Sequence, residues 1–194
     1  MIDIEQSKIT KMAQFGRIYY EYIFATQKHI YSKNEIEFIK GKQASFDSCE
    51  SNPKPYLTID ALCSGDISQT ATSGIKCSEN DLLMVMDGAS SGKVFLGNEG
   101  YVGSTLAKII CSKIDSSILY FGLKKFQNEL MNHTTGSAIP HADKQYVCEL
   151  PIADVNSQAQ LTRFKLIVSL LSDCQKRIVF LKQLKKSLLM KYFL

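Results

Sequence analysis

A five-residue segment with the spacing of a catalytic serine loop is the first feature that could carry chemistry. Residues 88–92 (GASSG) match the G-x-S-x-G pattern, in which a nucleophilic serine sits on a sharp turn between a strand and a helix. Ser90 would be the nucleophile. Residues 82–86 supply the strand, but residues 93–97 (KVFLG) predict a second short strand that ends in a turn. We interpret the segment as a loop between strands, with a small serine hydrolase that uses Ser90 as a minor alternative.

Two other segments resemble cofactor or substrate motifs without matching them. Gly92 and Lys93 end a stretch like a phosphate-binding loop, but only three residues separate its glycines, and Val94 replaces the Ser or Thr that would hold magnesium. Residues 52–56 (NPKPY) are similar to the N-P-P-Y motif of amino-methyltransferases, yet Lys54 breaks the spacing. We therefore predict no catalytic residues and no cofactor.

The cysteines and histidines do not form a metal-binding pattern. The six cysteines lie at least 14 residues apart, so the sequence contains no C-x-x-C pair. The histidines His29, His133 and His141 lack the helical spacing of paired ligands. We predict free thiols and no metal site.

Length and composition are those of an ordinary globular chain. With 194 residues, 45% hydrophobic and 22% charged, the chain can bury one core, so we expect one domain with an appendage. No stretch approaches the roughly 18 apolar residues of a membrane span. Residues 1–5 (MIDIE) lack the basic-then-apolar order of a signal peptide. We therefore expect a cytoplasmic protein without a membrane partner.

The net charge of +4 is distributed unevenly along the chain. Residues 151–194 hold eight basic and two acidic side chains, whereas residues 1–150 hold 15 basic and 17 acidic ones. Because the globular part is slightly acidic, bulk charge alone does not support DNA binding there. The basic residues near the end can complement a helix dipole and keep an apolar helix in solution without contacting DNA.

The elements that must position the polar loops are helices and short strands. Apolar residues at steps of three and four predict an amphipathic helix over residues 7–30, although Gly16 weakens it. A further helix is predicted over residues 115–131, followed by a polar loop at 133–137. Short apolar runs between turn residues predict strands at 36–39, 56–59, 82–86, 94–96 and 106–110. This combination indicates a compact mixed α+β domain.

The most regular pattern lies at the end of the chain. Ser157 and Gln160 have the capping-box form, and from residue 161 apolar positions recur at steps of three or four. A helix of about 34 residues would be roughly 50 Å long, more than a domain of this size covers. We therefore predict a coiled-coil helix that packs against another helix, with a core helix at the domain edge as the alternative. The positions assigned to a partner helix are Phe164, Val168, Leu171, Ile178, Leu181 and Leu188.

Several short motifs follow one another in a fixed order. They are residues 41–43 (GKQ), 56–59 (YLTI), 81–88 (DLLMVMDG), 92–94 (GKV), 100–106 (GYVGSTL), 136–141 (GSAIPH) and 150–152 (LPI), with Gln158 and Gln160 after them. Together they resemble the target recognition domain of type I restriction-modification specificity subunits and the entry into that family's long conserved helix. The resemblance covers residues 35–194.

The resemblance implies a non-catalytic adaptor. Residues 31–150 would form a target recognition domain that reads a half-site in double-stranded DNA. Residues 151–194 would form the conserved helix that docks methyltransferase subunits and, through them, a restriction subunit. Familiar members carry two recognition domains and two such helices, whereas one of each is found here, which suggests a homodimer through the C-terminal helix. The helix within residues 1–30 has no counterpart among the matched motifs.

Polar loops rich in hydrogen-bond donors are the candidate readers of base edges. Lysine can pair with guanine or phosphate, glutamine can hold adenine through two hydrogen bonds, and serine or threonine can serve either base. Each loop can equally be a solvated turn, and a helix-mediated protein-interaction module that reads no DNA stays open. The candidates are Lys42, Gln43, Ser45, Ser90, Ser91, Lys93, His133, Thr134, Thr135, Ser137 and His141.

Overall fold

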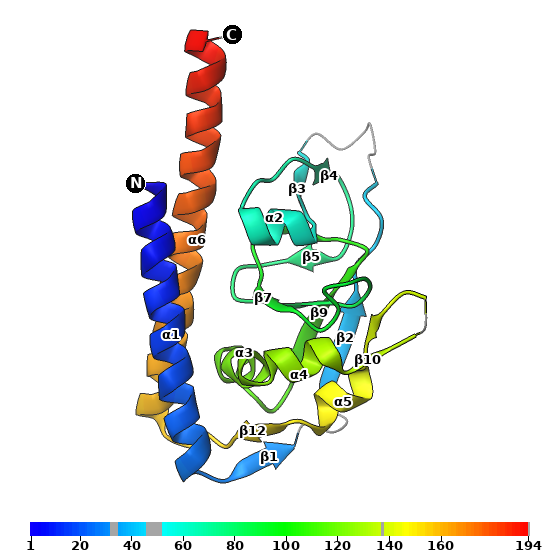
Figure 1. The fold of residues 1–194 in the computed structure, drawn as a ribbon, viewed down its shortest axis with the longest axis vertical. Helices are drawn as coiled ribbons and strands as arrows, with labels where there is room; N and C mark the ends of the chain where they lie inside the picture. Colours follow the sequence, from blue (N-terminus) through cyan, green and yellow to red (C-terminus); the bar gives the residue numbers. More distant parts are fainter. Residues whose placement is uncertain (32–34, 46–51, 137, 194) are drawn as a thin grey trace.

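Two long helices stand beside a globular body in the computed structural model, which describes residues 1–31, 35–45, 52–136 and 138–193 (Figure 1). Helix α1 (Ile2–Thr26) and helix α6 (Gln158–Phe193) pack side by side in opposite directions. Strand β1 (His29–Tyr31) pairs antiparallel with β12 (Pro151–Ala153) where the chain enters and leaves the body. The predicted N-terminal helix is therefore present, between residues 2 and 26.

The body combines two small sheets with short helices. The sheets have the strand orders β2-β9-β6-β7, with antiparallel neighbours, and β4-β3-β8-β5, in which β3 and β8 are parallel. This α+β body followed by a long C-terminal helix confirms the predicted fold class. Its elements are β2 (Ile36–Lys40), β3 (Lys54–Leu57), α2 (Ile59–Ser64), β4 (Thr70–Ala71), β5 (Lys76–Cys77), β6 (Leu82–Val85), β7 (Val94–Leu96), β8 (Gly100–Val102), β9 (Leu106–Cys111), α3 (Ser116–Lys125), α4 (Gln127–Asn132), β10 (Thr134–Thr135), β11 (His141–Ala142) and α5 (Lys144–Glu149).

Two predicted elements differ from the observed ones for local reasons. The strand expected at 56–59 ends at Leu57, because Thr58 caps helix α2 and its hydroxyl accepts a hydrogen bond from the Ala61 amide at 3.1 Å. The helix expected at 115–131 is two helices that meet at Phe126, where φ is −93° and ψ is 15°. This break lets the Phe126 ring contact the Phe24 ring of α1, with 5.9 Å between the ring centroids.

An aromatic cluster joins the two long helices to the body. The Phe164 ring of α6 lies 6.0 Å from the Tyr20 ring of α1 and 5.6 Å from the Phe121 ring of α3, and all three residues are buried. The Tyr20 hydroxyl accepts a hydrogen bond from the Ala153 amide at 3.0 Å. Burial raises the pKa of Tyr20 to about 12, so the hydroxyl stays protonated at neutral pH. The cluster therefore links α1, α3, α6 and β12.

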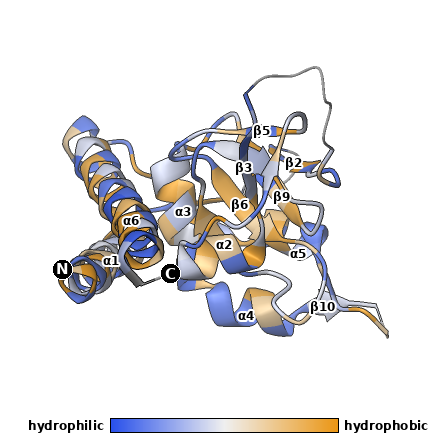
Figure 2. Cartoon of the chain, turned by 90° about the horizontal axis from the view of Figure 1, so that it is seen from above, coloured by the Kyte–Doolittle hydropathy of each residue, from blue (hydrophilic) through white to orange (hydrophobic). Residues whose placement is uncertain are grey.

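Two helical glycines permit this close packing. A Cβ atom at Gly16 would overlap the Phe121 ring, and one at Gly122 would lie 2.6 Å from Cδ1 of Ile152. Gly16, which weakens α1 as an isolated helix, is thus required where α1 meets α3. Viewed from above, α3 lies between the helix pair and the hydrophobic strands β6 and β9 (Figure 2).

The apolar seam of α6 faces mainly its own chain. At four of the six positions assigned to a partner helix the side chain is buried within this chain, where α1 lies along α6. Leu181 is half-buried, and Leu188 is exposed. The four buried side chains are Phe164, Val168, Leu171 and Ile178.

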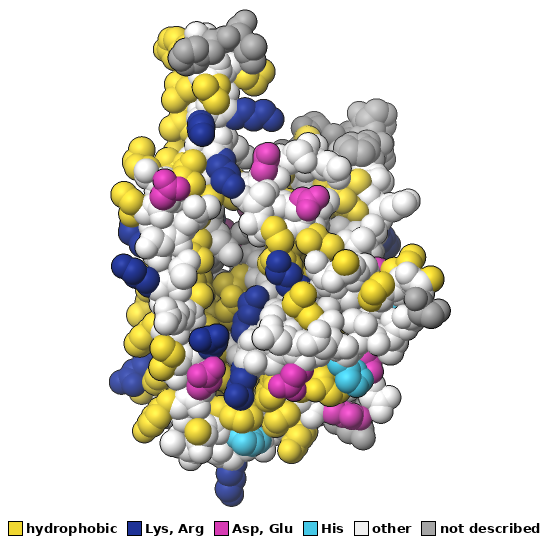
Figure 3. Space-filling model, in the orientation of Figure 1, with side chains coloured by type: hydrophobic (Ala, Val, Ile, Leu, Met, Phe, Trp, Pro, Cys, Tyr) yellow, Lys and Arg dark blue, Asp and Glu magenta, His cyan; other side chains and the backbone are white. Residues whose placement is uncertain are grey.

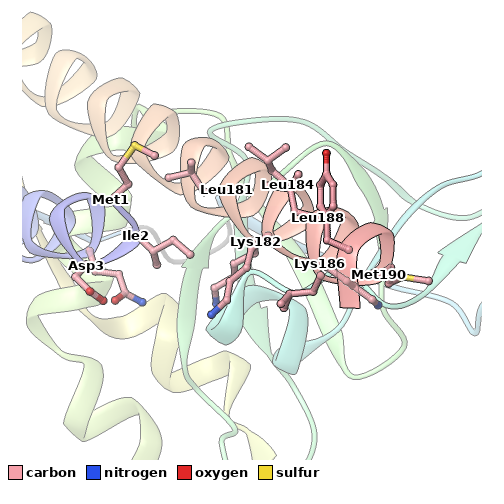
Figure 4. A pocket seen from close by; sticks show the side chains of 13 residues that line it. Met1, Ile2, Asp3, Leu181, Lys182, Leu184, Lys186, Leu188 and Met190 are labelled. Carbon is pink, nitrogen blue, oxygen red and sulfur yellow. The ribbon is translucent and has the colours of Figure 1, made fainter. Parts of the chain in front are cut away.

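The end of α6 extends past the start of α1 (Figure 1). Leu181, Leu188 and Met190 lie there beside Met1 and Ile2 around an open apolar groove (Figure 4). Apolar surface of the helix pair is therefore left uncovered by this chain. Across the described ranges, no helix combines the length and apolar character needed to cross a membrane.

Candidate nucleic-acid interface

The loop between β6 and β7 is anchored from inside. The Ser91 side chain is 1% exposed, and its hydroxyl lies 2.7 Å from the Gly88 carbonyl oxygen and 2.8 Å from the Pro140 carbonyl oxygen. Gly92 has a φ of 84° and contacts the Leu130 backbone, where a Cβ atom would overlap. The predicted loop between strands is confirmed, which removes the strand-turn-helix context of a serine nucleophile. The prediction of Ser91 as a base reader is wrong, because its hydroxyl is buried. The neighbouring candidate, Ser90, is half-buried.

A charged cluster lies at the end of β6. One carboxylate oxygen of Asp87 lies 2.7 Å from Nζ of Lys40, and the other lies 2.8 Å from Nδ1 of His141. Partial burial works to raise the pKa of Asp87, but the hydrogen bonds from Lys40 and His141 outweigh it and leave the pKa lowered. The ionised carboxylate therefore connects β2, β6 and β11.

The loop after β2 has a fixed backbone and exposed side chains, and the Ser45 hydroxyl lies 2.5 Å from the Ser73 hydroxyl oxygen. The Tyr56 hydroxyl donates to the Lys42 carbonyl oxygen at 2.9 Å and accepts from the Ser104 amide at 2.9 Å. The Ser45 carbonyl oxygen accepts from the Thr72 backbone amide at 3.0 Å and lies 3.1 Å from the Thr72 hydroxyl. The side chains of Lys42, Gln43 and Ser45 are exposed. The loop begins directly after Lys40, the residue of β2 that contacts Asp87.

The hairpin of β10 and β11 carries the next candidates. Thr134 pairs with Ala142 and Thr135 with His141, which places exposed Thr135 next to the Asp87 cluster. His133 lies at the other end of the short ladder, where its ring stacks on Tyr146 with 4.0 Å between centroids and its Nδ1 lies 3.3 Å from an oxygen of Asp143. Ser137, predicted as a reader, lies outside the described residues.

Lys93 belongs to a different neighbourhood. Its Nζ lies 3.4 Å from Sγ of Cys63 in α2 and 5.1 Å from the centre of the Phe95 ring. Nζ of Lys124 in α3 lies 5.8 Å from the same ring centre. The structure therefore separates Lys93 from the candidates around Asp87. Sequence reasoning missed Lys124, because a lysine in the last turn of a helix is common and 30 residues separate it from Lys93.

The arrangement places exposed hydrogen-bond donors on several loops of the body. Among the residues that the structure describes, no group of three or more His, Cys, Asp or Glu side chains is placed to hold a metal ion. A profile described as "Type I restriction modification DNA specificity domain" matches residues 19–190. The chain belongs to this family. The resemblance predicted from the motifs is thereby confirmed.

Relatives of this specificity-domain chain are longer than the chain itself. The "Type I restriction enzyme MjaVIII specificity subunit" of Methanocaldococcus jannaschii is 30% identical over 168 residues, which cover 81% of this chain and 40% of that protein. The type I restriction-modification S subunit from M. genitalium superimposes with a TM-score of 0.51 and 17% identity, over 73% of this chain and 38% of the other. The HsdS subunit from Thermoanaerobacter tengcongensis has a TM-score of 0.47 and 14% identity, over 94% and 47%. The chain thus spans less than half the length of each.

Proposed function

We propose that this chain reads a short DNA sequence as the specificity component of a type I restriction-modification complex and performs no chemistry itself. The observation that carries the proposal is the set of exposed donors in residues 42–45, held on a backbone that bonds to Tyr56 and Thr72, in a member of the DNA specificity family. Side chains of these types match the donor and acceptor patterns of base edges in the major groove.

The fixed backbone of the loop after β2 favours direct reading of base edges by its side chains. Because the backbone of the loop after β2 is tied to Tyr56 and Thr72, little conformational entropy is lost when its side chains meet DNA. Lys40 already pairs with Asp87, so its role is to position the loop and the hairpin. Lys42 and Gln43 are the base-reading side chains of this proposal, and Ser45, Thr135 and His141 support them.

The helix pair serves protein partners in this proposal. The groove that Leu181 and Leu188 line with Met1 and Ile2 leaves apolar surface open to a second chain. Two copies joined there would present two recognition domains related by symmetry, and such a dimer requires a palindromic target. The rest of the helix pair then docks the methyltransferase subunit, which brings the restriction subunit with it.

Selection from random duplex DNA tests the reading function. The full chain is used alone and together with the methyltransferase subunit of a type I system, and bound fragments are sequenced. We expect one enriched motif. Gln43→Ala should relax one position of it by about 1–3 kcal/mol, whereas Gln183→Ala, an exposed glutamine on α6, should leave the motif unchanged. Absence of any enriched sequence in either sample would favour the protein-interaction module.

A further inference from the structure

Two lysine ammonium groups meet around one aromatic ring on the side of the body that faces the helix pair. Nζ of Lys93 and Nζ of Lys124 lie 5.1 Å and 5.8 Å from the centre of the Phe95 ring. Cys63, which contacts Lys93, also lines a hollow of about 360 Å³ between α2 and the two long helices. In Figure 3, Lys and Arg side chains gather along the hollow between the helix pair and the body.

The charge of this lysine pair is not balanced by a carboxylate. Within the described residues, neither Lys93 nor Lys124 forms an ion pair with Asp or Glu. Nζ of Lys124 lies 3.3 Å from the side-chain oxygen of Gln127 and near the rings of Phe95 and Tyr120. Other lysines of the body are paired, namely Lys40 with Asp87, Lys54 with Glu99 and Lys108 with Asp81.

Two like charges around one ring without a counter-charge repel each other. Burial, and after it the neighbouring charge of Lys93, lowers the pKa of Lys124 to about 8. An anion placed between the two ammonium groups would remove this repulsion. Phosphate is a suitable anion, because lysine binds phosphate as a point charge and needs no fixed fork geometry.

We propose that Lys93 and Lys124 together bind a backbone phosphate of the DNA that the chain reads. This proposal rests on the proposed function and adds to it a contact that fixes the register of the duplex without reading sequence. The Phe95 ring holds both ammonium groups near the site through its π face. A competing role for Lys124 is purely structural, since it lies in the last turn of α3 and complements the helix dipole there.

The test compares binding of the full chain to two duplexes over a series of salt concentrations, one with the selected motif and one with that motif scrambled. Lys93→Ala and Lys124→Ala should each weaken binding of both duplexes by a similar factor, about 3- to 10-fold, and lower the slope of log Kobs against log salt by about 1. Lys125→Ala is the matched control, because its ammonium lies over the Phe24 ring instead; its slope should equal that of the unmodified chain. Lys124→Arg keeps the positive charge and should keep the slope of the unmodified chain.

Several results would overturn the proposal. Unchanged slopes for both alanine variants would do so, and so would a loss confined to the motif duplex, because that pattern indicates a base contact. Inorganic phosphate that binds in titration calorimetry with the same lysine dependence, while duplex binding is unaffected, would assign the site to free phosphate instead. If the unmodified chain binds both duplexes equally, sequence reading fails, yet the change in slope still decides whether the two lysines bind backbone phosphate.

Discussion

Nδ1 of His141 lies 2.8 Å from a carboxylate oxygen of Asp87, so the β10–β11 hairpin is fastened to the loop that follows β6. Lys40 contacts the other oxygen of the same carboxylate and adds the end of β2 to this junction. Three segments that are far apart in the sequence thus share one surface. The junction links the hairpin to the end of β2, from which the loop with residues 42–45 starts.

Asp87→Asn should loosen this junction. We expect the free energy of unfolding to fall by about 1 kcal/mol or less at pH 7, because the Lys40 and His141 side chains are half-exposed and water screens the ion pairs. The pKa of Asp87 is lowered in the folded chain, so its contribution is present above the unfolded value and is lost as pH falls through the folded value. Urea unfolding of both chains at pH 7 and near pH 3 measures this. A difference that grows on acidification would contradict the assignment.

Ser91→Ala and Ser90→Ala should differ in their effect on the stability of the chain. The Ser91 hydroxyl is buried beside the carbonyl oxygens of Gly88 and Pro140, each of which also accepts from a backbone amide, so its removal deletes only the hydroxyl bonds and should cost about 1 kcal/mol of stability. Ser90 is half-buried and should tolerate alanine within about 0.5 kcal/mol. Thermal and urea unfolding compare the two. Equal stability of both variants would show that the Ser91 bonds do not hold the loop.

The neighbouring serines illustrate what the sequence can predict and what it cannot. Turn residues and short apolar runs located β2, β6, β7 and β9, because these strands are bounded by local signals. Burial of Ser91 depends on Pro140, which is distant in the sequence, so no local pattern separates it from Ser90. Likewise, periodicity predicted the apolar face of α6, but a seam does not specify its partner, and α1 supplies it.

Gly16→Ala tests the contact between α1 and α3. In an isolated helix this change would stabilise by about 1 kcal/mol, because alanine has the higher helix propensity. Here the new methyl group would overlap the buried Phe121 ring, and we expect a net loss of about 1–3 kcal/mol. Urea unfolding followed by circular dichroism gives the sign. Net stabilisation would mean that Phe121 moves aside at little cost.

Lys124 should make stability depend on pH above neutrality. Its pKa is about 8 in the folded chain, through burial and the nearby Lys93, whereas an unfolded lysine titrates near 10.4. Between these values the unfolded chain binds more protons, so the free energy of unfolding should rise with pH. Lys124→Gln should lack this rise when both chains are unfolded in urea at several values between pH 7 and 10. Cys63 is also nearby, so Cys63→Ser serves as the control and should keep the rise. Parallel curves for the unmodified chain and the glutamine variant would refute the prediction.

Leu171→Asp and Leu188→Asp distinguish the inner part of α6 from its exposed end. Leu171 is 2% exposed in the main core, and a buried charge without a partner costs several kcal/mol, so Leu171→Asp should prevent stable folding of the chain. Leu188 is 47% exposed and lines the groove beside Met1. Leu188→Asp should therefore keep the circular dichroism spectrum and melting temperature of the unmodified chain.

The effect of Leu188→Asp should appear in self-association. If two copies join through the groove at the end of α6, this variant should sediment as a monomer at micromolar concentrations at which the unmodified chain is a dimer. Leu170→Asp is the control, because Leu170 is also exposed on α6 but does not line that groove, and it should leave the dimer intact. Sedimentation velocity on the three chains decides between the outcomes. If the unmodified chain is a monomer, the groove binds a different partner, for which the methyltransferase subunit is the first candidate. A stably folded Leu171→Asp chain would contradict the packing of α6 against α1.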